Sequence, residues 1–104
     1  MRILSMAVAG VSLAAAAYAE NHVVNQKGRE FSTASITVKP GDTITFTNSD
    51  DVTHNVFSFS PGQEFEIKRQ VPGGSSTVPF AKEGTAEVRC SIHPKMKLIV
   101  TIKK

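Results

Sequence analysis

The sequence predicts an all-β protein, a Greek-key β-sandwich folded as a single small domain. Three observations lead to this fold class. Short stretches alternate apolar and polar residues, as strands with one buried face do. Clusters of Gly, Pro, Asn, Asp and Ser separate these stretches at short intervals. Beyond the N-terminal segment, no window carries apolar residues at the spacing of an amphipathic helix.

The N-terminal segment, residues 1–19, has the composition of a secretory signal peptide. Arg2 supplies a positive start, residues 3–18 carry no charge, and Ala17-Tyr18-Ala19 is a small-x-small cleavage site. The uncharged run is shorter than the ~20 residues of a transmembrane helix. We therefore expect export to the periplasm, cleavage after Ala19 or after Ala17, no stable membrane insertion, and a mature domain of residues 20–104.

Seven strands are expected in the mature chain. A Pro-Gly pair in Lys39-Pro40-Gly41-Asp42 is the signature of a type II turn, which predicts a hairpin between the strands on either side. Pro79 places its strand at a sheet edge, because proline cannot donate to a ladder. The expected strands are residues 36–38, 43–47, 54–58, 65–67, 77–80, 85–90 and 98–102.

Charge says little about function. The formal net charge is +3, and Arg2 would leave with the signal peptide, so the mature chain is mildly basic. The basic residues are scattered, apart from a few lysines near the C-terminus, and are not interleaved with aromatic residues. We therefore expect no nucleic-acid binding.

The stretch CSIHPKM, residues 90–96, concentrates the rare chemistry of the chain. Cys90 is the only cysteine, and Met96 is the only methionine left after processing. No disulfide can form within one chain, and an unpaired thiol in an exported protein suggests that something occupies its sulfur. Cys90, His93 and Met96 follow one another at intervals of three, within reach of one point in a short loop.

A thiolate, an imidazole and a thioether form a soft set of ligands. Zinc takes Cys and His but gains little from a thioether, whereas copper is served by all three. An electron-transfer copper site needs a second imidazole. His54 begins an expected strand, where a site at the sandwich rim can form, and His22 is the other candidate.

These segments resemble the cupredoxins, the small type 1 (blue) copper proteins. The resemblance rests on NSDDVTHNVF at residues 48–57, on CSIHPKM, and on the VKPGDTITF stretch before them. The spacing of Cys, His and Met is similar to that of amicyanin- and plastocyanin-like members. Lys95 departs from those members, which have an apolar residue between Pro and Met, and the aromatic residue often found before the cysteine is absent.

The resemblance implies a role for each matching residue. His54, Cys90 and His93 would be the trigonal ligands of one copper ion and Met96 the axial ligand. Asn55 would join the two ligand segments by hydrogen bonds, here with Ser91. The exposed edge of His93 would be the electron exit, and the partners would be redox proteins such as a c-type cytochrome or a periplasmic dehydrogenase.

The resemblance thus implies a periplasmic electron carrier that cycles between Cu(I) and Cu(II). We expect no enzyme activity, since nothing in the sequence supplies an open coordination position. The alternatives are a copper-binding protein for resistance or delivery, and an adhesion or interaction β-domain without metal. The mature chain has no Met-rich or His-rich tail of the kind that storage would use.

Processing raises one further hypothesis. Cleavage after Ala19 would give Glu20-Asn21-His22 a free amine, two backbone amides and an imidazole, a square-planar set that suits Cu(II) or Ni(II). The alternative is that His22 is an ordinary histidine at the start of a strand.

Overall fold

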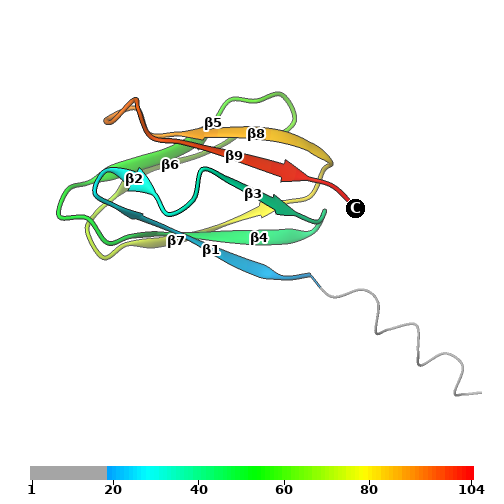
Figure 1. Ribbon diagram of the computed structural model, residues 1–104, viewed down its shortest axis with the longest axis horizontal. Coiled ribbons are helices and arrows are strands. Elements are labelled where there is room, and N and C mark those ends of the chain that lie inside the picture. The colour runs from blue at the N-terminus through cyan, green and yellow to red at the C-terminus, as the bar shows by residue number, and fades with distance from the viewer. Residues whose placement is uncertain (1–18) are drawn as a thin grey trace, which may run out of the picture.

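The computed structural model describes residues 19–104, which fold into two β-sheets packed face to face (Figure 1). The expected signal peptide lies, except for Ala19, outside the described residues. Within residues 19–104 no helix is long and apolar enough to cross a membrane. The predicted fold class, an all-β sandwich in a single domain, is confirmed.

Nine strands make up the two sheets of the described chain. One sheet has the order β2-β1-β4-β7 and the other the order β3-β9-β8-β5-β6. Both sheets mix parallel and antiparallel pairs. The strands are β1 Asn21–Lys27, β2 Glu30–Phe31, β3 Ser35–Val38, β4 Asp42–Asn48, β5 His54–Ser58, β6 Phe65–Gln70, β7 Ser75–Phe80, β8 Gly84–Arg89 and β9 Lys97–Ile102.

The alternation in the sequence corresponds to the buried faces of the strands. In β4, residues alternate between buried and partly exposed positions along the whole strand. Alternate residues of β8 and β9 are buried in the same core, and Cys90 continues the buried face of β8. The buried members are Ala86, Val88, Cys90, Leu98, Val100 and Ile102.

The predicted hairpin between residues 36–38 and 43–47 is wrong. The turn itself is present: the Asp42 amide donates to the Lys39 carbonyl over 2.9 Å, and Gly41 has a φ of 99°. However, β3 pairs in parallel with β9, while β4 pairs with β1 and β7. The turn therefore carries the chain from one sheet to the other, because the pairing partners of β3 and of β4 belong to different sheets.

Two strands were absent from the prediction, and one predicted edge strand is confirmed. β1 lies beside β4 in parallel, with His22 opposite Ile44, so His22 belongs to a sheet. The short strand β2 follows β1 through a tight turn. β7, which contains Pro79, is at the edge of its sheet as predicted.

Phe46 is the centre of the core between the sheets. Its ring is fully buried, and its centroid lies 6.4 Å from that of Phe31 and 5.9 Å from that of Phe65. Phe65 in turn packs edge to face against Phe80 at 5.9 Å. A buried phenylalanine of this kind contributes about 3–5 kcal/mol relative to alanine.

The two ends of the sandwich differ. One end carries the C-terminus and the 39–42 turn. The opposite end gathers the turn between β1 and β2, the loop between β4 and β5, and the orange loop between β8 and β9 (Figure 1). The predicted ligand residues belong to these last loops and to the adjoining strand ends.

Asp42 holds together, by hydrogen bonds, the end of the sandwich that carries the C-terminus. Its buried carboxylate accepts hydrogen bonds from the Glu20 amide at 2.8 Å, from His22 Nε2 at 3.0 Å and from the Lys39 amide at 2.9 Å. These donors, the Glu20 amide first, lower the pKa of Asp42 from 3.8 to about 2. One carboxylate thus joins the start of β1 to the turn before β4.

Asp42→Asn should reduce the acid sensitivity of folding. Because the pKa of Asp42 is depressed in the folded state, its contribution to stability is present above pH 3.8 and lost as the pH falls toward about 2. Urea denaturation at a series of pH values measures this, with the exposed Asp51→Asn as control. Parallel stability curves for wild type and Asp42→Asn would contradict the assignment.

Candidate metal centre

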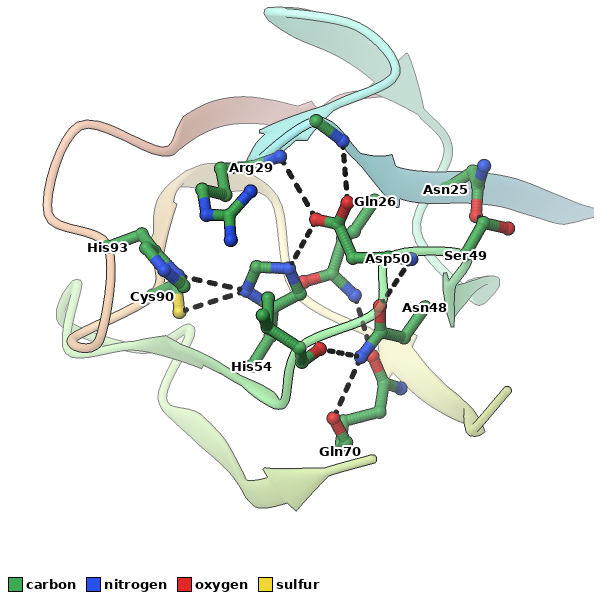
Figure 2. A network of polar contacts seen from close by, with 12 residues as sticks. Asn25, Gln26, Arg29, Asn48, Ser49, Asp50, His54, Gln70, Cys90 and His93 are labelled. Carbon is green, nitrogen blue, oxygen red and sulfur yellow. Dashed lines mark hydrogen bonds and ion pairs between the residues drawn. The ribbon is translucent and has the colours of Figure 1, made fainter. Parts of the chain in front are cut away.

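Three of the predicted ligand side chains meet at the loop-rich end of the sandwich. His54 is the first residue of β5, Cys90 directly follows β8, and His93 lies in the loop between β8 and β9. Their ligand atoms all lie within 4.8 Å of one another. The Cys90 sulfur is 3.6 Å from His54 Nδ1, and His93 Nδ1 is 3.3 Å from the same nitrogen (Figure 2).

The three residues differ in how far they are exposed to solvent. His54 and Cys90 are completely buried, whereas His93 is partly exposed. The rings of His54 and His93 meet edge to face with centroids 5.0 Å apart. One side of the cluster therefore lies inside the protein, and the other side reaches the surface through His93.

The fourth predicted ligand, Met96, lies at the end of a tight turn. Its amide donates to the His93 carbonyl over 3.0 Å, which closes a turn with Pro94 and Lys95 at its centre. Arg89 braces the turn by donating from its guanidinium to the Pro94 carbonyl at 2.9 Å. The Met96 side chain returns to the interior, where the residue is 2% exposed.

Asn55 joins the strand of His54 to the loop of Cys90. Its side-chain amide donates to the Ser91 hydroxyl over 2.8 Å, and its carbonyl accepts from the Ser91 amide at 2.7 Å. The pairing of β5 with β6 has an irregular register between His54 and Val56. Asn55 lies at this irregularity, and its side chain bonds to the other ligand segment.

His54 is held by a carboxylate that the sequence analysis did not identify. Its Nε2 lies 2.7 Å from Asp50 Oδ2, and the Asp50 side chain is only 6% exposed (Figure 2). Asp50 also accepts from the amides of Gly28 at 2.7 Å and Arg29 at 3.0 Å, at the turn between β1 and β2. Arg29 there has a φ of 59° and Gly28 a φ of 65°, which turn both amides toward the carboxylate.

The ionised carboxylate of Asp50 decides which nitrogen of the His54 ring carries the hydrogen. Burial disfavours the ionised carboxylate, but hydrogen bonds from His54 and from the Arg29 and Gly28 amides outweigh it and hold the pKa of Asp50 below its ordinary value. An ionised carboxylate only accepts hydrogen bonds, so His54 Nε2 carries the hydrogen. In the neutral ring, the lone pair is then on Nδ1, which faces Cys90 and His93.

Asn48 sets the path of the loop that carries Asp50. Its side-chain amide donates to the carbonyls of Val52 and Gln70, each at 2.9 Å, and its carbonyl accepts from the Asp50 amide. Gln70 extends this buried network to Gln26, whose amide donates to it over 2.6 Å. The polar layer directly below the cluster therefore ties the two sheets together.

The donor set fits a soft or borderline metal ion. A thiol sulfur and two imidazole nitrogens face one another, and no charged carboxylate is among the three convergent atoms. Copper(I), copper(II) and zinc accept such donors, whereas magnesium and calcium prefer oxygen. In the neutral ring, the hydrogen bond from Nε2 to Asp50 leaves the lone pair of His54 Nδ1 available to a metal.

A second cluster of donors, Glu20, His22 and Asp42, lies at the opposite end. Asp42 is engaged by three hydrogen bonds, one of them from His22. The square-planar arrangement proposed for Glu20-Asn21-His22 conflicts with this geometry. Residues 21 and 22 are extended in β1 beside β4, so wrapping their amides around a metal would require the start of β1 to detach.

The sequence offered a weak signal for some of the supporting residues. Asp50 stands four residues before His54 in a turn-forming run, but nothing local indicates that its carboxylate turns back to the ring. The roles of Asn48, Gln70 and Arg89 were not predicted. Asn48 and Gln70 bond to backbone carbonyls that are distant in sequence. Arg89 bonds to the nearby Pro94 carbonyl, but no local pattern indicates that its side chain turns toward this loop.

A single-domain β-sandwich with one thiol and two imidazoles gathered at one end defines a class of small metal-binding proteins. Residues 18–103 match the family of copper binding proteins described as plastocyanin/azurin, and the chain belongs to this family. The predicted cupredoxin resemblance is therefore confirmed, and the cofactor is one copper ion, as predicted.

Curated relatives and a solved structure agree with this family. The methylamine utilization protein MauL of Methylorubrum extorquens is 31% identical over 94% of this chain and 89% of its own length. Amicyanin-alpha of the same organism is 32% identical over 71% of this chain and 65% of its own length. A reduced variant of amicyanin superposes with a TM-score of 0.75 at 25% identity, covering 86% of this chain and 89% of that one.

Asp50→Ala should destabilise the copper-free protein by about 1–3 kcal/mol, because it leaves the buried His54 Nε2 hydrogen without an acceptor. Urea denaturation measures the loss. Asp51→Ala is the matched control, since Asp51 is the exposed neighbour of Asp50. Equal free energies of unfolding for the two variants would show that the Asp50–His54 contact does not stabilise the fold.

Proposed function

We propose that this chain is a periplasmic blue copper protein that carries single electrons between redox partners. The observation that carries the proposal is the convergence of the Cys90 sulfur with one ring nitrogen each of His54 and His93 within 4.8 Å. Bound copper would supply a one-electron couple between Cu(I) and Cu(II). Membership of the plastocyanin/azurin family and the names of the relatives, among them amicyanin, support this function.

In this proposal His54, Cys90 and His93 are the three strong ligands and Met96 is the weak axial one. Asn55 and Ser91 hold the two ligand segments in register through their paired hydrogen bonds. Asp50 fixes the ring of His54, and Arg89 braces the turn that leads to Met96. Ligands fixed before the metal binds change little between oxidation states, which favours rapid electron transfer.

Burial supports a carrier over an enzyme. His54, Cys90 and Met96 are at most 2% exposed, so these side chains shield three sides of the site from water and from small molecules. His93 alone is partly exposed. An electron can cross the edge of an imidazole ring, whereas a substrate would need an open coordination position beside ligands that are almost entirely buried.

The processing and location of the protein form part of the proposal. Residues 1–19 would direct export and be removed, which leaves the domain of residues 20–104 in the periplasm. Electron donors and acceptors there would be soluble redox proteins, such as a c-type cytochrome or a dehydrogenase. The name of the relative MauL, a methylamine utilization protein, fits a dehydrogenase partner.

Absorption spectroscopy of residues 20–104 loaded with copper and oxidised with ferricyanide tests the site. We expect an intense blue or green thiolate-to-copper band, and Cys90→Ser should abolish it because a hydroxyl cannot replace the thiolate. His22→Ala, a change at the opposite end, should keep the band. A colourless wild-type protein that binds zinc as tightly as copper would overturn the proposal.

Electrochemistry separates a carrier from a copper-delivery protein, the alternative that the same ligands would allow. We expect a reversible one-electron wave and no release of Cu(I) to a competing chelator on the timescale of the scan. Met96→Leu should raise the reduction potential, because it removes a donor that favours Cu(II). An irreversible wave with rapid loss of Cu(I) would instead favour delivery.

A further inference from the structure

A shallow surface pocket borders the partly exposed side of the proposed copper centre. Its lining residues are Arg29, Ile92, His93, Pro94 and Lys95. Arg29 comes from the turn between β1 and β2, and the other four come from the loop between β8 and β9. Ile92 is 51% exposed, so apolar surface lies open next to the one candidate ligand that reaches solvent.

The rim of this pocket is positively charged. Arg29 and Lys95 are exposed, and neither takes part in an ion pair within residues 19–104. Asp50, which bonds to the Arg29 amide, already accepts the hydrogen of His54. Figure 2 shows the Arg29 side chain extending on the same side of the His54 ring as His93.

The neighbouring residues do not cancel this charge. Lys27, at the end of β1, lies two residues before Arg29, and Lys97, at the start of β9, lies two residues after Lys95. Both lysines are exposed. The acidic residues beside them are Glu30, which follows Arg29, and Asp51 on the loop before β5. The ionised Asp50 adds a third negative charge near Arg29, and Arg89 is paired with Glu87. Four other cations against three anions still leave one positive charge in excess at the end of the sandwich where His93 is exposed.

We propose that this basic rim, Arg29 and Lys95 around the apolar surface of Ile92 and Pro94, is the docking surface for a redox partner whose electron-exchange site is ringed by carboxylates. The inference rests on the electron-transfer function proposed above. Charges of opposite sign steer two proteins into register and speed their encounter. The apolar centre lets the partner exclude water at His93.

The docking surface is formed before a partner arrives. The Arg89 bond to the Pro94 carbonyl and the paired bonds between Asn55 and Ser91 fix the loop that carries Ile92 and Lys95. The Arg29 backbone is fixed by its bond to Asp50. Little ordering is then required on binding, which suits a partner that must associate and leave quickly.

Charge-reversal variants and two oxidants of opposite charge test the proposal. Stopped-flow mixing of the reduced copper protein with ferricyanide, an anion, or with tris(phenanthroline)cobalt(III), a cation, follows the transfer of one electron from the protein to the complex. The variants are Lys95→Glu and Arg29→Glu. Lys104→Glu is the matched control, with the same change of charge at the opposite end of the sandwich (Figure 1).

At an ionic strength of ~0.01 M, Lys95→Glu should slow ferricyanide roughly tenfold and accelerate the cobalt complex, because a nearby charge is weakly screened there. Arg29→Glu, which alters the rim from a different loop, should act in the same direction. Added salt should reduce both effects. Lys104→Glu should change each rate less than Lys95→Glu does, because it lies at the end of the sandwich opposite to His93 and the interaction between charges weakens with their separation.

Equal responses of Lys95→Glu and Lys104→Glu would overturn the docking surface, because overall charge would then set the rates. A second arm compares two c-type cytochromes of similar potential, one with an acidic and one with a basic surface. The acidic cytochrome should react faster, and faster reaction of the basic one would refute the proposal. Absence of a thiolate-to-copper band in the wild type would instead remove the electron-transfer function itself.

Discussion

The hydrogen bond between His54 Nε2 and Asp50 is the contact on which the rest of the metal centre depends. It joins a strand of one sheet to the turn between β1 and β2 in the other, since the same carboxylate accepts from Gly28 and Arg29. It also decides which nitrogen of His54 faces Cys90 and His93. A single side chain thereby sets the position of a ligand and the tautomer of its neutral ring.

The surrounding residues extend this constraint to the other ligands. Asn48 fixes the loop before β5, Asn55 ties β5 to Ser91, and Arg89 holds the turn at Pro94. The bond from Asn55 to Ser91 joins segments that are distant in sequence, whereas the bonds of Asn48 and Arg89 hold the loops that directly follow these residues. The ligand end of the sandwich therefore behaves as one rigid assembly, although much of its backbone lies outside regular strands.

The sequence predicted what depends on local pattern and failed where distant segments decide. Alternation placed β4, β8 and β9 correctly, because a strand with one buried face shows it in its own residues. The Pro40-Gly41 turn was also predicted, but not that it leads into the opposite sheet, since a turn does not specify which strand pairs with which. Asp50 escaped prediction because its partners come together only through the fold.

Cys90 has a consequence for the study of motion in this protein. It is the only thiol of the chain, it is the first residue of the loop between β8 and β9, and its side chain is completely buried against His54 of β5. A thiol-modifying reagent reaches it only when that loop lifts away from β5. The labelling rate of the copper-free protein therefore reports how often the loop opens, and no probe has to be introduced.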